Sequence, residues 1–329
     1  MHPTVTELDL QALAPGRVHH LWLHLVDDKL GHPIRLPIVV ARGSEEGPVL
    51  GLTAALHGNE LNGIPIIHRV FAELDAPGQG SLALKGTVVG VPGVNVPGML
   101  LEQRVFNDGE DPNRLFPGVA NGNTSQVFVH RFLHRVVAKL DQLLDLHTAS
   151  FGRVNSFYAR ADMGDAGTQR MARLQNPRII LNNPPNDRTM RGAAAALGVR
   201  AVTLELQDPF VFQEDVITNG AQGVKNLLVD AGMIEGELLC AIYPTTVCER
   251  SYWLYTDVGG ILTVFPEVAE RVRAGQRIAR VTDLFGKVVR EYEAPEDGIV
   301  IGKSVNPLNQ TGSRILHLGI GLSDVPCLA

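Results

Sequence analysis

Two kinds of apolar pattern alternate along the first two thirds of the chain. Short apolar runs, typical of buried strands, cover residues 49–56, 87–94, 143–146 and 201–206. Stretches with an apolar residue every three or four positions, typical of amphipathic helices, cover residues 64–74, 126–140, 165–174, 189–197 and 213–231. Strands that alternate with helices predict an α/β fold with a mixed, mainly parallel sheet and helices on both of its faces.

Both ends of the chain carry strand patterns instead. Near the start, residues 20–25 alternate and residues 34–41 form a second candidate strand. We expect an α/β domain at residues 1–245 and, because the chain then consists of short strands and turns, a smaller all-β domain at residues 246–329. Its turns resemble those of biotinyl/lipoyl-like barrel-sandwich domains, but the carrier lysine is absent and only Lys287 lies nearby.

The composition argues against several classes of protein. A chain of 329 residues, 45% of them hydrophobic, suffices for one large domain and a small one. The net charge of −6 and the lack of a long basic run argue against a nucleic-acid or anionic-membrane partner. No signal-peptide pattern or transmembrane stretch is present. Cys240, Cys248 and Cys327 have no metal-binding spacing, so we expect no disulfide framework and a reducing, cytoplasmic setting.

The first candidate site lies in the turn between the strand that ends at Leu56 and the following helix. Asn62 is a suitable N-cap and Pro65 suits the first helical turn. His57 and Glu60 therefore lie at the carboxyl end of a strand, where open α/β sheets place their sites. An imidazole and a carboxylate at this spacing can bind one divalent ion, and such donors suit zinc. The alternative is a His and a Glu that only satisfy backbone groups of the turn.

Two further strand ends carry groups of the same kind. His147 follows a short apolar strand, and Glu205 is the penultimate residue of the strand 201–206. A carboxylate in an otherwise apolar strand is costly to bury unless it is paired or functional. His57, Glu60 and His147 would form a three-ligand metal set with an open position for water. Glu205 would be the base beside that water.

A long irregular segment, residues 95–124, is rich in Gly, Pro, Asn and Asp. Loops of this length inside a compact domain are usually functional. The segment carries two permanent cations, Arg104 and Arg114, and an amide donor, Asn113. The alternative for both arginines is a surface salt bridge with an acidic residue nearby, the candidates being Asp108, Glu110 and Asp111.

Histidines elsewhere have simpler interpretations. His20 and His24 lie on one face of the predicted strand 20–25, directly after His19, and no carboxylate has a matching position. His130 and His134 have the spacing of a zincin helix, but the residue after the first of them is Arg where that motif needs Glu. We interpret both groups as ordinary residues of a strand and of a helix.

Four motifs, in this order, resemble those of the succinylglutamate desuccinylase/aspartoacylase family, which are small-molecule deacylases with a carboxypeptidase A-like zinc domain. The matching segments are residues 55–63 for the first zinc motif, 111–118 for the Asn-Arg motif, 145–148 for the third ligand and 203–206 for the catalytic Glu. The resemblance covers nearly the whole chain. Pro112 departs from it, because many relatives have an apolar residue there and a proline changes the aim of Asn113 and Arg114. Some relatives have a late substrate-contacting tyrosine, for which Tyr252 and Tyr255 are both candidates.

The resemblance implies hydrolysis of the amide bond of a small N-acylated substrate that carries a carboxylate. One zinc ion per chain would be held by the three-ligand set. The implied roles are proton transfer for Glu205, oxyanion stabilisation for Arg104, and binding of the substrate carboxylate for Asn113 and Arg114.

Two other functions stay open. A metallocarboxypeptidase acting on peptides could use the same residues, although the missing export signal and the C-terminal β domain argue against it. A non-catalytic binding protein on the same scaffold would have lost a metal ligand or the base, and all are present. The acyl group, the amine, the physiological metal, the pathway and the formation of a homo-oligomer are not readable from the sequence.

Overall fold

The computed structural model describes residues 2–75, 82–185 and 187–328. Its helices are α1 (Gly63–Leu74), α2 (Val96–Leu100), α3 (Thr124–Arg135), α4 (Ala166–Leu174), α5 (Met190–Ala196) and α6 (Glu214–Asp230), with 3-10 turns η1 (Pro112–Arg114) and η2 (Val137–Lys139). The strands up to residue 206 are β1 (Thr4–Val5), β2 (Arg17–Asp27), β3 (Pro33–Arg42), β4 (Glu45–Ala54), β5 (Lys85–Val91), β6 (Gln142–His147), β7 (Arg153–Asn155), β8 (Phe157–Ala161), β9 (Ile179–Asn182) and β10 (Arg200–Leu206). The later strands are β11 (Thr245–Tyr255), β12 (Gly260–Val264), β13 (Arg271–Val272), β14 (Arg277–Thr282), β15 (Val288–Glu293), β16 (Gly298–Ser304), β17 (Leu308–Asn309) and β18 (Arg314–Val325).

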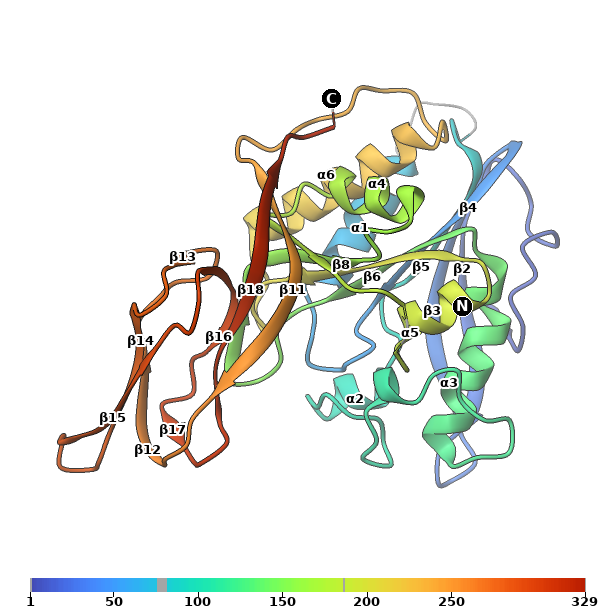
Figure 1. The fold of residues 1–329 in the computed structure, drawn as a ribbon. Coiled ribbons are helices and arrows are strands. Elements are labelled where there is room, and N and C mark those ends of the chain that lie inside the picture. Colours follow the sequence, from blue (N-terminus) through green and yellow to red (C-terminus); the bar gives the residue numbers. More distant parts are fainter. Residues whose placement is uncertain (1, 76–81, 186, 329) are drawn as a thin grey trace.

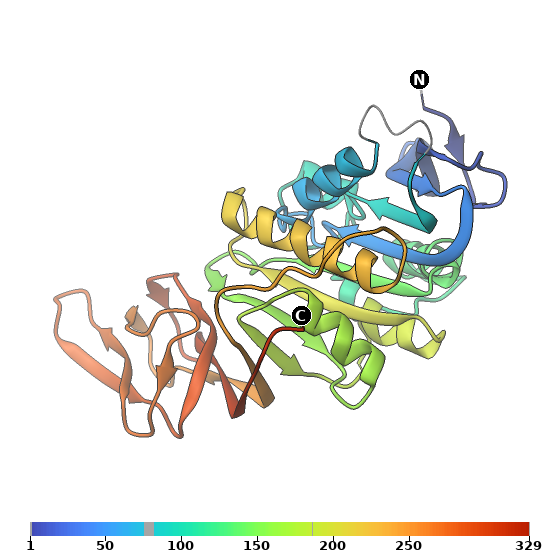
Figure 2. The ribbon, with the colours of Figure 1, turned by 90° about the horizontal axis from the view of Figure 1, so that it is seen from above.

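One mixed sheet of 14 strands organises the molecule, in the order β1-β2-β3-β5-β4-β6-β10-β8-β9-β11-β18-β16-β13, with β7 paired to β16. Its central strands β5, β4, β6 and β10 pair in parallel. Helices α1, α4 and α6 cover one face, and α3 and α5 cover the other (Figure 1). Seen from above, α6 lies between α1 and α4 (Figure 2). The predicted α/β class is confirmed.

The central strands are largely apolar because both of their faces are buried. Strand β6 shows this, since successive side chains point to opposite faces of a sheet. Leu144 belongs to the core under α1, α4 and α6, where it joins residues such as Ile67 and Val224. Leu143 belongs to the opposite core, which contains Phe128 of α3. The end of β6 is therefore held from both sides, which fixes the position of the residues that follow it.

The C-terminal β region forms a lobe at one side of the molecule, coloured orange to red in Figure 1. A separate antiparallel sheet, β15-β14-β12-β17, lies in this lobe and packs on its own apolar core. Strand β11 pairs with β9 of the α/β part and with β18, and β16 pairs with β7. The hydrogen-bond ladder of the large sheet thus crosses residue 245, and the division into domains at 245/246 stays a prediction.

The predicted helices and strands are present, with shifted ends. The helix predicted at residues 126–140 is α-helical to Arg135 and continues as the 3-10 turn η2. Asn62 occupies the N-cap position of α1, but its side chain does not cap the helix. Instead, Asn62 donates to the Leu206 carbonyl at 2.9 Å and accepts from the Gln213 backbone N–H at 3.1 Å. The residue therefore joins the start of α1 to the chain that follows β10.

We expected no disulfide framework, and the structure contains one disulfide. Cys240 and Cys327 form a disulfide that joins the C-terminal tail to the segment before β11. The two residues are 87 positions apart, so no local spacing could indicate the pair. Cys248 is free and buried. The cysteines therefore no longer support a reducing compartment, and the cytoplasmic location stays a prediction. No helix in the described part of the chain is long and apolar enough to cross a membrane.

Candidate active site

Three buried side chains meet at the carboxyl ends of β4 and β6. His57 Nδ1 lies 3.0 Å from Glu60 Oε2, His147 Nδ1 lies 2.8 Å from the same oxygen, and the two nitrogens are 3.1 Å apart. Nitrogen and oxygen ligands about 2.1 Å from a tetrahedral ion stand about 3.4 Å apart. The three atoms therefore fit one divalent ion after a small outward shift. The residues expected as ligands from the sequence come together as a candidate metal-ion triad.

The turn after β4 aims two of these side chains at the third. Ala55 has a positive φ of 53°, which is uncommon for a residue other than glycine and turns the chain sharply. The Glu60 backbone N–H then donates to the His57 carbonyl at 3.0 Å and closes the turn. A Cβ at Gly58 would overlap the backbone of α2, so only glycine fits between the turn and that helix.

Carboxylates behind the triad orient both imidazoles. Asp145 Oδ2 lies 2.8 Å from His147 Nε2, and Asp111 Oδ1 lies 3.1 Å from His57 Nε2. Thr53 holds Asp145 in turn, through a hydrogen bond of 2.9 Å. A carboxylate on the outer nitrogen of a histidine fixes its ring and makes it a better metal ligand. Neither support was identified from the sequence, although Asp145 stands two positions before His147 and so shares its face of β6.

The charges around the triad favour a cation at its centre. Burial raises the pKa of Glu60, but His57 and His147 outweigh it and hold that pKa well below its usual range. Burial lowers the pKa of His147, but Asp145 and Glu60 outweigh it and raise that pKa well above its usual range. Positive charge is thus stabilised between these groups, and a divalent ion supplies positive charge. The donor set and its electrostatics both fit a metal ion.

The second oxygen of Glu60 is occupied from the other side. Ser150 Oγ donates to Glu60 Oε1 at 2.6 Å, and Arg104 Nη1 donates to the same oxygen at 2.8 Å. Arg104 and Ser150 also contact each other. Glu60 therefore offers only Oε2 to the centre of the triad, and this oxygen also accepts from the Thr148 backbone N–H at 3.3 Å. Ser150 was not identified from the sequence, because a lone serine after a strand is too common to be a signal.

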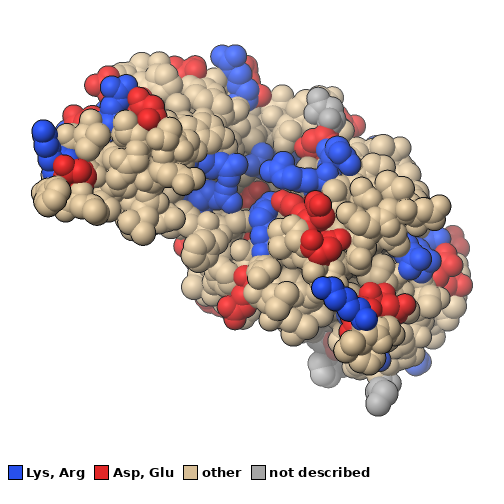
Figure 3. All heavy atoms as spheres, turned by 90° about the horizontal axis from the view of Figure 1, so that it is seen from below, with Lys and Arg blue, Asp and Glu red and all other residues tan. Residues whose placement is uncertain are grey.

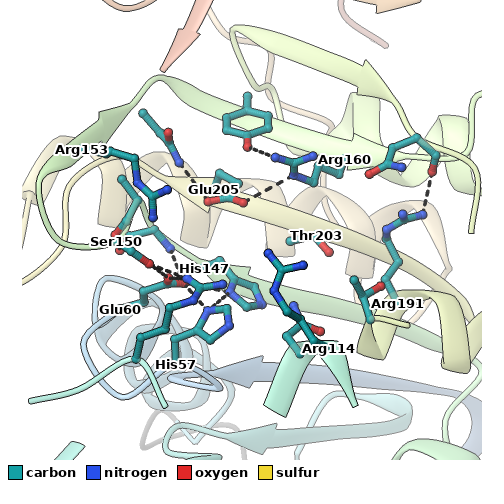
Figure 4. Close-up of a pocket in the computed structure, with 18 of the residues that line it drawn as sticks. His57, Glu60, Arg114, His147, Ser150, Arg153, Arg160, Arg191, Thr203 and Glu205 are labelled. Carbon is teal, nitrogen blue, oxygen red and sulfur yellow. Dashed lines mark hydrogen bonds and ion pairs between the residues drawn. The ribbon is translucent and has the colours of Figure 1, made fainter. Parts of the chain in front are cut away.

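Glu205 lies beside the triad because β10 runs parallel to β6, with Glu205 in register with His147. Asn155 Nδ2 donates to Glu205 Oε2 at 3.0 Å, and Arg160 Nε lies 3.5 Å from Oε1. The side chain is 14% exposed and faces the cavity (Figure 4). Its carboxylate is thus held by two donors next to the triad.

Arg104 is anchored by two carboxylates. Its Nη1 contacts Glu60 and its Nε lies 3.0 Å from Asp111 Oδ2. Burial lowers the pKa of Arg104, but Glu60 and Asp111 outweigh it and raise that pKa. The side chain remains 34% exposed and lines the cavity. Arg104 therefore forms the salt bridge with Asp111 that was one of the alternatives from the sequence. Its contact with Glu60 also places its guanidinium at the triad.

Asn113 and Arg114 lie on the 3-10 turn η1 at the cavity wall. Pro112 opens this turn, and the Asp111 side chain caps it by accepting from the Asn113 backbone N–H at 3.0 Å. A proline suits such a first position, so the departure from the family pattern leaves the turn regular. Asn113 Oδ1 accepts from the Met190 backbone N–H at 2.8 Å, which leaves its amide Nδ2 for other partners. Arg114 is 75% exposed and only reaches Asp111 at 3.5 Å.

The cavity in front of these residues measures about 280 Å³, near the lower limit for a small-molecule site. Basic side chains gather around the hollow in which it lies (Figure 3). Lining residues that the sequence did not indicate include Arg153, Asn155, Arg160, Arg191, Trp253 and Arg314. Of the two late tyrosines considered as substrate contacts, neither Tyr252 nor Tyr255 lines the cavity. The Tyr252 hydroxyl donates to Glu296 at 2.9 Å instead. A different tyrosine, Tyr158, lines the cavity.

The chain matches one family model over residues 46–230, that of the succinylglutamate desuccinylase/aspartoacylase catalytic domain. A curated relative is the N-alpha-acetyl-L-2,4-diaminobutyric acid deacetylase of Halomonas elongata. It is 28% identical over 294 residues, which cover 84% of this chain and 83% of the relative.

Two solved structures share the fold. The product-bound ectoine utilization protein EutE from Ruegeria pomeroyi has a TM-score of 0.82 at 22% identity and covers 94% of this chain and 97% of its own. A succinylglutamate desuccinylase/aspartoacylase from Rhodobacter sphaeroides has a TM-score of 0.84 at 20% identity, with 97% and 98% covered. At these identities the likeness shows the fold alone.

Proposed function

The chain belongs to the succinylglutamate desuccinylase/aspartoacylase family, and from this premise we propose that it is a zinc-dependent deacylase. Its reaction would be hydrolysis of the amide bond of a small N-acylated amino acid or a related N-acylated amine. The observation that carries the proposal is the meeting of His57, Glu60 and His147 at one point, with Glu205 in register beside them. A non-catalytic protein on the same scaffold would not require three metal-ligand side chains and a carboxylate to lie together.

The proposed metal site uses all three donors of the triad. A zinc ion bound there would lower the pKa of a water molecule to about 7 and polarise the scissile carbonyl. Asp145 and Asp111 would keep the two imidazoles oriented, and Arg104 with Ser150 would keep Glu60 to a single ligand oxygen.

Glu205 is the proposed proton carrier. Asn155 and Arg160 fix its carboxylate at the edge of the cavity, so its oxygens need no reorganisation before they accept the proton of the attacking water. The same carboxyl group would then return the proton to the leaving amine. Arg104 would donate a hydrogen bond to the carbonyl oxygen as that oxygen gains negative charge.

The proposed carboxylate anchor is the pair Asn113 and Arg114. Arg114 has a largely free guanidinium, which can bind a carboxylate through two parallel hydrogen bonds. The side-chain oxygen of Asn113 accepts from the Met190 backbone N–H, and its amide Nδ2 makes no hydrogen bond to the residues that the structure describes. A cavity of about 280 Å³ has room for an N-acylated amino acid, which supports a small substrate.

Metal analysis and a substrate panel test the proposal. Protein purified without added metal should contain one zinc per chain, and it should hydrolyse N-acetyl, N-formyl or N-succinyl amino acids. A hexapeptide cleaved as well as the best N-acyl amino acid would favour a metallocarboxypeptidase. Zinc-loaded protein that hydrolyses neither class would favour a non-catalytic binding protein.

A further inference from the structure

The cavity carries more positive charge than the proposed reaction uses. Six arginines line it, which are Arg104, Arg114, Arg153, Arg160, Arg191 and Arg314, against two lining carboxylates, Glu60 and Glu205. A divalent ion at the triad would add two further positive charges. Like charges at such short range destabilise each other unless an anion lies between them, so the excess indicates an anionic ligand.

Half of these arginines have a carboxylate partner of their own. Arg104 contacts Glu60 and Asp111, Arg160 lies 3.5 Å from Glu205, and Arg191 lies 3.4 Å from Asp187. Arg114 shares Asp111 at 3.5 Å and is the proposed anchor of one substrate carboxylate. These four therefore have a structural or proposed role.

Arg153 and Arg314 are the arginines left over. Within the part of the chain that the structure describes, neither has a carboxylate oxygen within 4.0 Å. Both guanidinium groups lie instead over the ring of Trp253, with their central carbons 5.9 Å and 4.9 Å from the ring centroid. A cation–π contact positions a guanidinium without using its N–H donors, and it does not neutralise the charge.

The surroundings of Arg314 oppose its charge. Burial lowers the pKa of Arg314, and the positive charges of Arg114 and Arg104 lower it further. An anion bound at Arg314 would offset that repulsion.

The tryptophan that holds both arginines is itself fixed. Its ring stacks on His317 at 5.0 Å with an interplanar angle of 10°, and His317 Nε2 is hydrogen-bonded to Ser251 Oγ at 2.7 Å. Strand β7, which begins at Arg153, is bonded to β16 of the C-terminal β region. In Figure 4, Arg153 and Arg114 reach toward the cavity from different sides. The arrangement is thus a preformed pair of cations on β7 and β18, whereas the Asn113–Arg114 anchor is on η1.

We propose that Arg153 and Arg314, held on Trp253, form a second anion subsite, and that the substrate carries a second carboxylate in addition to the one at Asn113 and Arg114. This inference rests on the proposed deacylase function. The second carboxylate belongs either to the acyl chain or to the amino-acid side chain, which share the same chemistry. A substrate with an additional ammonium group is disfavoured at this subsite, because two guanidinium groups repel it.

Matched substrate pairs that differ by one charge test the subsite. On the amine side, the pair is N-acetylglutamate and N-acetylglutamine; on the acyl side, it is an N-succinyl amino acid and its terminal amide. For at least one pair, kcat/KM of the zinc-loaded protein should be about tenfold or more higher for the dianion, the size of a charged hydrogen bond. The pair that shows the preference identifies the source of the second carboxylate. N-acetyl-2,4-diaminobutyrate should be a poorer substrate than the preferred dianion.

Substitutions then assign the preference to the two arginines. In Arg153→Ala and Arg314→Ala, the ratio of kcat/KM between the dianion and its neutral partner should fall toward one, and Arg314→Glu should shift the preference toward the ammonium substrate. Arg277→Ala is the matched control, because Arg277 also lies over an aromatic ring, that of Phe265, but is outside the cavity. Its ratio should equal that of the wild type.

The possible failures differ from one another. If the zinc-loaded protein hydrolyses no member of the panel, the proposed function is wrong. If it hydrolyses the panel with a ratio near one in both pairs, or if the ratio is the same after loss of either arginine, the second subsite is wrong and the deacylase proposal stands. The wild-type ratios need no substitution, so a variant that fails to fold leaves the test intact.

Discussion

His317 makes the stability of the protein dependent on pH in a window that can be calculated. The side chain is 4% exposed, and Tyr158, Trp253 and the cations Arg160 and Arg314 surround it. Burial, followed by those two positive charges, lowers the pKa of His317 from 6.5 to about 3. The imidazole therefore stays neutral in the folded protein at pH values where it takes up a proton after unfolding.

Proton linkage gives the direction and the size of the change in the free energy of unfolding with pH. Between about pH 3 and 6.5 the unfolded chain binds more protons than the folded one, so stability falls as the pH falls through this range. From pH 7 to pH 5 the loss is about 2 kcal/mol for this single group. The result hardly depends on the folded pKa as long as that pKa is below about 4, because the unfolded state then takes up nearly all of the protons.

The perturbation is His317→Gln, which keeps a polar partner for Ser251 and removes the titrating group. The measurement is urea unfolding at pH 7, 6 and 5, followed by the fluorescence of Trp253 in a Trp22→Phe background. Both proteins are kept metal-free with a chelator, because acid would otherwise release the metal and add a second pH dependence. Between pH 7 and pH 5, the free energy of unfolding of the wild type should fall by about 2 kcal/mol more than that of the variant. Equal losses in the two proteins would refute the assignment of a neutral, buried His317.

Four further results are expected. Glu205→Gln should keep its zinc and lose about 100- to 10,000-fold in kcat, whereas turnover within a few-fold of wild type would exclude Glu205 as the base. His147→Ala should lose zinc in elemental analysis, and full occupancy would remove this residue from the site. Arg114→Ala should mainly raise KM and Arg104→Ala should mainly lower kcat, so a rise in KM alone for both would contradict the oxyanion role. Unfolded protein should react with one equivalent of thiol reagent before reduction, from Cys248, and with three after it; three before reduction would exclude the disulfide.

The metal ligands could be predicted because they follow a rule of local sequence. Each apolar run that ends in a polar, chemically active residue places that residue at one edge of the sheet, as His57 and His147 show. The order of the strands in the sheet was not needed for this step. The register that brings Glu205 beside His147 depends on β10 being the neighbour of β6, which only the assembled sheet shows.

The cationic half of the cavity could not be predicted in the same way. Arg153 and Arg314 are far apart in the chain and belong to no motif, and surface arginines are too common to be informative singly. They become informative only when the structure places both on Trp253, with no carboxylate oxygen of the described residues within 4.0 Å of either. The disulfide escaped prediction for the same reason, since long-range packing of the tail brings Cys327 to Cys240.

The ladder between β7 and β16 couples the C-terminal β region to the surroundings of Glu205. The C-terminal β region contributes to the cavity wall through Trp253 of β11 and Arg314 of β18. Gly302 of β16 lies so close to Asn155, the partner of Glu205, that a Cβ would displace that amide. A chimaera that exchanged this region between relatives would alter selectivity and the alignment of the base together. A change in the C-terminal β region would therefore reach the carboxylate of Glu205 through the strand pairing itself.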